Sequence, residues 1–208
     1  MGYISNPDDM FIRGASASGF IFEPFESTPP FQPTIVVPSN NPIMNILNPG
    51  VVGQARQRKY AGYYADNLSF FDGATPVATG YGRPEIDANS EDNYSMMWTG
   101  YIYAPSWGDY VLETTSDDAS MLWIGDKAIT GWNTGNADVN NGGLHGATPR
   151  DTLPNILRME NGWYPFRAVF GEQNGAEKMA IRMYKYGATT DEWVSFSYNS
   201  ATPEGFNP

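Results

Sequence analysis

Apolar and polar positions alternate along much of the second half of the chain. Residues 162–170 carry an aromatic or apolar side chain at every second position, and residues 178–184 repeat that pattern. Because alternate side chains of a β-strand point to the same face, each segment predicts a strand with one buried face. Further strands are expected at residues 60–64, 94–103, 110–115, 121–124 and 192–198. No stretch has a helical period, so the pattern predicts an all-β chain folded as an antiparallel β-sandwich.

The first fifty residues follow a different pattern. Eight of the 16 prolines lie there, and proline fixes φ and removes a backbone donor, so neither a helix nor a central strand is expected. The segment also carries apolar side chains such as Phe20, Ile21 and Phe22, which a free linker would not. An extended Pro-rich arm of this kind packs either on its own domain or on a neighbouring subunit. We favour the subunit, in a homo- or hetero-oligomeric assembly formed through residues 1–50.

Residues 51–59 connect the arm to the β domain. Arg56, Arg58 and Lys59 make this short segment basic, and we interpret it as a solvated hinge rather than a basic binding patch. The predicted organisation is an arm and hinge at 1–58, a β-sandwich at 59–200 and a C-terminal tail at 201–208.

Charge and cysteine content narrow the classes of function. The 208 residues carry a net charge of -11, which argues against a nucleic-acid partner, because such a partner needs a basic face. Cysteine is absent, so disulfides, zinc–thiolate sites and cysteine nucleophiles are excluded. No segment is apolar over the length needed for membrane insertion, and the polar, acidic start is not a signal peptide. We expect a location on an extracellular surface or a virion.

Two adjacent carboxylates mark the point where one predicted strand ends and the next begins. Asp117 and Asp118 precede an apolar run in which Leu122 and Ile124 share one face. The carboxylates then lie at the end of the sheet, where they need counter-charge, water or a metal ion. Taken alone, the pair is also a common turn signal, because Asp favours turns through its own hydrogen bonds.

The remaining polar residues give little support for catalysis. His145 is the single histidine, so a catalytic triad has no obvious assembly, and we interpret it as a surface residue. Adjacent aspartates on one turn suit chelation better than glycoside hydrolysis, which needs carboxylates facing each other across a sugar. We therefore expect no enzyme activity. Residues 131–154 form a long loop rich in Gly and Asn, in which Trp132 would offer a flat face to a ligand, although tryptophan is more often buried in the core.

Several motifs in order resemble one known family. Residues 98–111 read Trp-Thr-Gly-Tyr-Ile-Tyr-Ala-Pro-Ser-Trp-Gly-Asp-Tyr-Val, and residues 116–125 read Ser-Asp-Asp-Ala-Ser-Met-Leu-Trp-Ile-Gly. Together with residues 60–64, 162–172 and 192–194, they resemble a PA14-type domain and its GLEYA relatives. The resemblance covers about residues 59–200 and leaves the arm outside.

The resemblance implies a site as well as a fold. Sugar-binding members of the family hold Ca²⁺ between two adjacent aspartates joined by a cis peptide bond, with an Asn from a later loop, and sugar hydroxyls take the open positions. By position, Asp117 and Asp118 match the pair and Asn174 matches the Asn. Glu172 and Gln173 lie in the loop that sets sugar preference, and with Trp132 they are the weaker candidates for ligand contact. The chain departs from the well-studied adhesins, which carry cysteines and a signal peptide, and residues 172–175 match no known version of the loop that sets sugar preference. The resemblance therefore supports the metal site better than any named sugar.

Two functions follow from these observations. The first is a calcium-dependent module that binds a cell-surface glycan and is displayed on a larger surface assembly or virion. The second is a purely structural virion protein, such as a phage tail, fibre or capsid decoration subunit, anchored by the arm. In the second case the PA14-like fold serves only as a scaffold.

Overall fold

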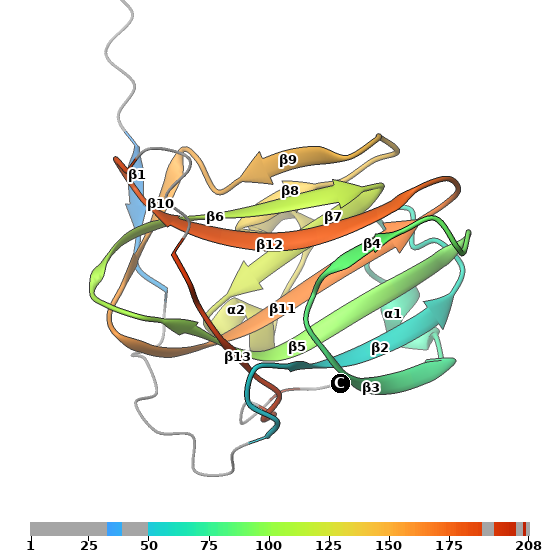
Figure 1. Ribbon diagram of the computed structural model, residues 1–208, viewed down its shortest axis with the longest axis horizontal. Helices are drawn as coiled ribbons and strands as arrows, with labels where there is room; N and C mark the ends of the chain where they lie inside the picture. Colours follow the sequence, from blue (N-terminus) through green and yellow to red (C-terminus); the bar gives the residue numbers. More distant parts are fainter. Residues whose placement is uncertain (1–32, 39–49, 189–193, 203–205, 207–208) are drawn as a thin grey trace, which may run out of the picture. The chain divides into compact units, whose positions relative to one another are not determined.

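A computed structural model describes residues 33–38, 50–188, 194–202 and 206 (Figure 1). All of them lie in one compact unit, Gln32–Pro208. Most of the predicted arm and residues 192–193 of the last predicted strand lie outside the described residues. Among the described residues, no helix has the length and apolar content to cross a membrane.

Two sheets form the fold, and both are antiparallel except at one edge. The first sheet has the order β1 (Thr34–Val36), β10 (Asn155–Met159), β6 (Gly108–Asp117), β12 (Glu177–Lys185) and β4 (Ile86–Ala88), with β9 (Thr148–Asp151) also paired to β6. The second has the order β3 (Ala78–Gly82), β2 (Ala55–Ala61), β5 (Tyr94–Ala104), β11 (Gly162–Glu172), β7 (Ala119–Ile124) and β8 (Val139–Asn141), with β13 (Tyr198–Asn199) paired to β5. The all-β sandwich predicted from the sequence is confirmed.

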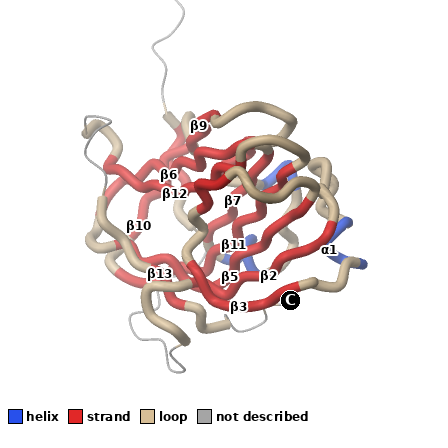
Figure 2. Tube along the Cα trace, turned by 45° about the vertical axis from the view of Figure 1, so that its right-hand side comes forward, coloured by secondary structure: helices blue, strands red, loops and turns tan. Residues whose placement is uncertain are grey.

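Helical structure is limited to single turns over the described ranges. These are α1 (Phe70–Gly73), α2 (Asp126–Ile129) and a 3-10 turn at Thr134–Asn136. In Figure 2 strands dominate the described trace and the helical turns are short.

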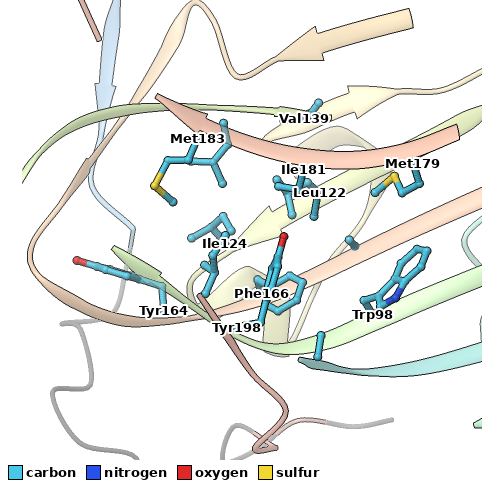
Figure 3. Packing of buried hydrophobic residues seen from close by; sticks show 14 of the residues in the cluster. Trp98, Leu122, Ile124, Val139, Tyr164, Phe166, Met179, Ile181, Met183 and Tyr198 are labelled. Atoms are coloured by element: carbon cyan, nitrogen blue, oxygen red, sulfur yellow. The ribbon is translucent and has the colours of Figure 1, made fainter. Parts of the chain in front are cut away.

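The main core lies between the two sheets (Figure 3). Tyr164 and Phe166 of β11 pack there with Leu122 of β7, and Met179 and Met183 enter from the facing sheet. These are the inward positions that the alternation predicts. Burying each side chain of this size contributes about 1.5–3 kcal/mol of transfer free energy, so the core accounts for the pairing of the two sheets.

A second apolar cluster covers the outer face of the second sheet. Met121 and Trp123 of β7 belong to it, and they alternate with the inward residues of the same strand. Phe71 of α1 and Ala128 of α2 pack against them. Strand β7 is therefore buried on both faces, which explains its continuous apolar sequence.

The hinge predicted at residues 51–59 is wrong over most of its length. Strand β2 begins at Ala55, and it pairs with β5 on one side and β3 on the other. The sequence pattern did not indicate this strand, because three of its residues, Arg56, Arg58 and Lys59, are charged. Short strands β3, β4, β8 and β9 likewise replace parts of the predicted loops.

The described part of the arm packs on its own domain. Strand β1 pairs in parallel with β10 of the same chain, and Val51 N donates to Ser200 Oγ at 2.7 Å. The last predicted strand is shorter than expected, since only Tyr198–Asn199 is a strand and residues 194–197 are not.

Candidate functional site

The acidic pair lies where the chain passes from one sheet to the other. Strand β6 of the first sheet ends at Asp117, and β7 of the second sheet begins at Ala119. Asp118 alone separates the two strands. The peptide bond between Asp117 and Asp118 is cis, as the resemblance implies.

Glu172 adds a third carboxylate to this pair. It is the last residue of β11, and the preceding Gly171 pairs with Ala119. This register brings the end of β11 beside the crossing. One carboxylate oxygen from each of Asp117, Asp118 and Glu172 lies within 4.8 Å of the others, and we call this set the acidic cluster.

The three carboxylates differ in their hydrogen bonds. Asp118 accepts from His145 N at 3.1 Å and from Gln173 N at 3.0 Å. Asp117 accepts from the backbone N–H of Ala147. Glu172 is fully buried, at 0% exposure, and neither of its carboxylate oxygens has a hydrogen-bond partner within the described part of the chain.

Burial and mutual repulsion perturb the ionisation of the site. Burial, followed by the charges of Asp118 and Asp117, raises the pKa of Glu172 to about 7. Burial and then Asp118 also raise the pKa of Asp117. The nearby Tyr63 has its pKa raised to about 12 by burial and by surrounding carboxylates. The site is thus short of positive charge.

The loop after β11 is held beside the acidic cluster by its backbone. Asn93 N donates to Gln173 O at 3.0 Å, and Gly175 N donates to Asp92 Oδ1 at 3.1 Å. The side chains of Gln173 and Asn174 are exposed. Both predicted loop residues therefore border the cluster and face solvent.

Close packing fixes the strand that carries Glu172. A Cβ added to Gly171 would lie 2.6 Å from the ring of Tyr64 and 2.7 Å from the ring of Tyr63. Tyr64 is in turn held by a backbone hydrogen bond to Ser95 Oγ at 3.0 Å. Glycine at this position lets the two tyrosines pack directly on β11.

Trp132 lies outside the acidic cluster. Its ring packs edge-on to Trp123 at 5.4 Å between centroids, and the Arg167 guanidinium lies 4.1 Å from its centroid. It is half-buried in the outer apolar cluster, although it also lines a cavity with Asp66 and Asn133. The structure thus brings together Asp117, Asp118, Glu172 and Gln173, with Asn174 in the adjoining loop, and places Trp132 in a different environment.

Two contributors to the site differ from the expectation. The sequence names Glu172 as a candidate for ligand contact, whereas the structure places its carboxylate beside those of Asp117 and Asp118; its position at the end of an alternating segment was the available signal. The other contributor is the loop carrying His145, which is half-buried and donates its backbone N–H to Asp118. A backbone donor leaves no signal in the side-chain pattern.

Comparisons with known proteins agree with this architecture. Residues 94–185 match the GLEYA domain, while no protein with a curated description matches the sequence. The fold is similar to that of the epithelial adhesin 6 A domain from Candida glabrata in complex with Galb1-3GlcNAc, with a TM-score of 0.59 and 11% identity over 78% of this chain and 93% of that one.

Two further structures share the fold. One is the PA14 domain of the MpAFP antifreeze protein, with a TM-score of 0.53 and 14% identity over 78% of this chain and 100% of that one. The other is the PA14 sugar-binding domain from an RTX adhesin, with a TM-score of 0.50 and 16% identity over 74% of this chain and 100% of that one. The chain therefore has the fold of PA14 domains, and its residues 94–185 match the GLEYA domain.

Proposed function

We propose that this domain binds a carbohydrate through a calcium ion held at the acidic cluster. Asp117, Asp118, Glu172 and Asn174 are the proposed ligands. The observation that carries the proposal is the burial of Glu172, whose two oxygens are unpartnered beside two other carboxylates. A buried carboxylate without a partner is costly, and a cation at this position would remove the cost.

Among the described residues, none of the recorded ion pairs joins a cationic side chain to the acidic cluster. The ion pairs found among the described residues join Lys59, Arg83, Lys127, Arg158 and Lys178 to acids outside the cluster. The charge deficit at the cluster is therefore met by protonation of Glu172 or by a bound cation.

The donor set suits calcium. Ca²⁺ takes six to eight hard oxygen ligands in flexible geometry, and the carboxylates, the Asn174 amide and backbone carbonyls are all hard oxygens. When bound, the ion would offer its open positions to vicinal hydroxyls of a sugar. Gln173 and Asn174 lie at the exposed rim, where they would contact that sugar, and Trp132 is a weaker candidate because its ring packs against Trp123 and Arg167.

Similar folds support carbohydrate as the ligand. Adhesin domains of this fold have been solved with Galb1-3GlcNAc and with beta-lactose. A glycan-binding role would place the domain on an outer surface, as part of a larger assembly or a virion. We propose no catalytic role, because the role proposed for the acidic cluster is to hold a metal ion.

Calorimetric titration tests the metal and the sugar separately. We expect saturable calcium binding, and binding of a galactose-containing disaccharide only when calcium is present. Asp118→Ala should abolish both, whereas Glu85→Gln, which removes an exposed acid paired with Arg83, should change neither. Full calcium binding in Asp118→Ala would refute the metal site, and sugar binding in the presence of a chelator would refute the role of the metal.

A further inference from the structure

A second polar pocket lies on the outer face of the second sheet, away from the acidic cluster. It is lined by Arg56, Arg58, Thr79, Gly80 and Tyr81, and we call it the arginine pocket. The strand register accounts for its composition. Arg56 pairs with Tyr81 and Arg58 with Thr79 across β2 and β3, so two guanidinium groups and two hydroxyl side chains share one face.

The arginines have donors that nothing in the described part of the chain satisfies. Arg58 is only 9% exposed, and its Nη1 has no hydrogen-bond partner. The Nε of Arg56 is buried and unpartnered as well. None of the ion pairs among the described residues includes either arginine. In a chain with 23 acidic and 12 basic residues, two neighbouring arginines without an acidic partner among the described residues are unexpected.

Positive charge accumulates further along the same face. Arg56 and Arg167 both pair with Thr99 of β5, one from each side. Burial and then the charge of Arg58 lower the pKa of Arg167 to about 9. The guanidinium groups of Arg56 and Arg58 thus give this face a positive charge that a bound anion would offset.

We propose that the arginine pocket binds an oxyanion, namely a sulfate, phosphate or carboxylate group. Arg56 and Arg58 donate hydrogen bonds to its oxygens, and Thr79 and Tyr81, which line the same pocket, would add their hydroxyls. Guanidinium groups suit this role because their planar, charged donors match the spacing of oxyanion oxygens. The cavity measures about 270 Å³, just below the range typical of drug-sized ligands, and so it fits a small ionic group or one substituted sugar.

The arginine pocket is independent of the proposed calcium site. Arg56 pairs with Thr99, whereas Glu172 pairs with Tyr94 on the same strand. Five residues of strand separate the two positions by about 17 Å. Occupation of the arginine pocket therefore does not require calcium, and the two proposals can fail separately.

Titration with sodium sulfate at constant ionic strength, in the presence of a calcium chelator, tests the pocket in the full-length chain. We expect saturable binding of one sulfate, weakened about tenfold or more by Arg56→Gln, since a hydrogen bond to a charged group contributes that much. Lys59→Gln is the matched control, because Lys59 lies next along β2 but pairs with Glu91 and should leave sulfate binding unchanged. Tyr81→Phe gives a milder loss without changing charge.

Comparison of two probes identifies the source of the oxyanion. Galactose 6-sulfate binding more tightly than inorganic sulfate would support the proposal with an acidic sugar as ligand, and equal affinity would support it with a free ion. Absence of saturable sulfate binding, or equal weakening by Arg56→Gln and Lys59→Gln, would overturn it.

Discussion

The ionisation of one residue, Glu172, determines how the acidic cluster responds to pH. Its pKa is raised from 4.5 to about 7, first by burial and then by Asp118 and Asp117. In the calcium-free fold, Glu172 therefore holds a proton more tightly than in the unfolded chain. The stability from this proton is fully present below about pH 4.5 and is lost as the pH rises through about 7. Calcium needs the ionised form, so its affinity should rise over the same range.

Proton release on calcium binding follows from this shift. At pH 6 most Glu172 is protonated in the calcium-free fold, so binding should release about one proton. The measurement is the calcium-binding enthalpy in buffers of different ionisation enthalpy. Glu172→Gln should lose the buffer dependence and bind calcium more weakly, while Glu85→Gln should keep both. Equal enthalpies in all buffers for the unaltered chain would contradict the prediction.

The packing beside the acidic cluster depends on the absence of a side chain at Gly171. An added Cβ would overlap the rings of Tyr63 and Tyr64, so Gly171→Ala should lower the free energy of unfolding by about 1–3 kcal/mol, the usual range for overpacking. Gly73→Ala is the control, because a Cβ there meets nothing within 4 Å. Urea unfolding measures both variants, and equal effects would show that the contact at Gly171 is unimportant.

The sequence predicts the aspartate pair of the acidic cluster. Two adjacent aspartates before an apolar run indicate that the chain turns at Asp117–Asp118 and then enters a strand. The place of Glu172 depends on the pairing of Gly171 with Ala119, a contact between residues far apart in the chain. Local patterns contain no information on such a register, so the third carboxylate could be named as a candidate but not placed.

Among the elements, one buried ion pair joins α2 to the segment before β8. Lys127 Nζ lies 2.6 Å from Asp138 Oδ1, and Asp138 Oδ2 accepts from Ile124 N at 2.8 Å. The Asp138 side chain is only 4% exposed. Removal of Lys127 would leave a buried charge without its partner, which is more costly than loss of a surface pair.

Two matched lysine substitutions test this difference. Lys127→Ala should lower the free energy of unfolding by about 1–3 kcal/mol, less than for a fully buried pair because Lys127 is partly exposed. Lys178→Ala should change it by less than about 1 kcal/mol, because its partner Asp87 is 82% exposed. Thermal or urea unfolding of both variants provides the comparison, and a cost for Lys178→Ala that matches Lys127→Ala would contradict it.

The predictability of the strands depended on their place in the sheets. Strands β5, β11 and β12 are each nine or more residues long, and the sequence pattern predicts each to within a few residues. The sequence pattern does not predict the short strands β3, β4, β8 and β9, and it predicts a hinge where β2 begins. Arg56 and Arg58 of β2 look like linker residues in the sequence, because their side chains line a polar pocket instead of packing in an apolar core.

For the whole chain, the role of the N-terminal segment is a prediction of its own. The segment Met1–Phe31 lies outside the described residues and contributes none of the described strands. Its deletion therefore keeps β1 paired with β10 and should leave the sandwich folded. We expect the shortened chain to retain its circular dichroism and thermal midpoint and to lose any oligomer that the full chain forms, as measured by light scattering. An oligomer that survives the deletion would exclude this segment as the assembly element.

The passage of the chain between sheets at Asp118 has a mechanical consequence. Asp117 ends a strand of the first sheet, and Glu172 ends a strand of the second. A force that slides one sheet past the other must separate these two side chains. An ion bound by both would oppose that motion, so the loaded domain would yield under shear at a higher force than the empty one.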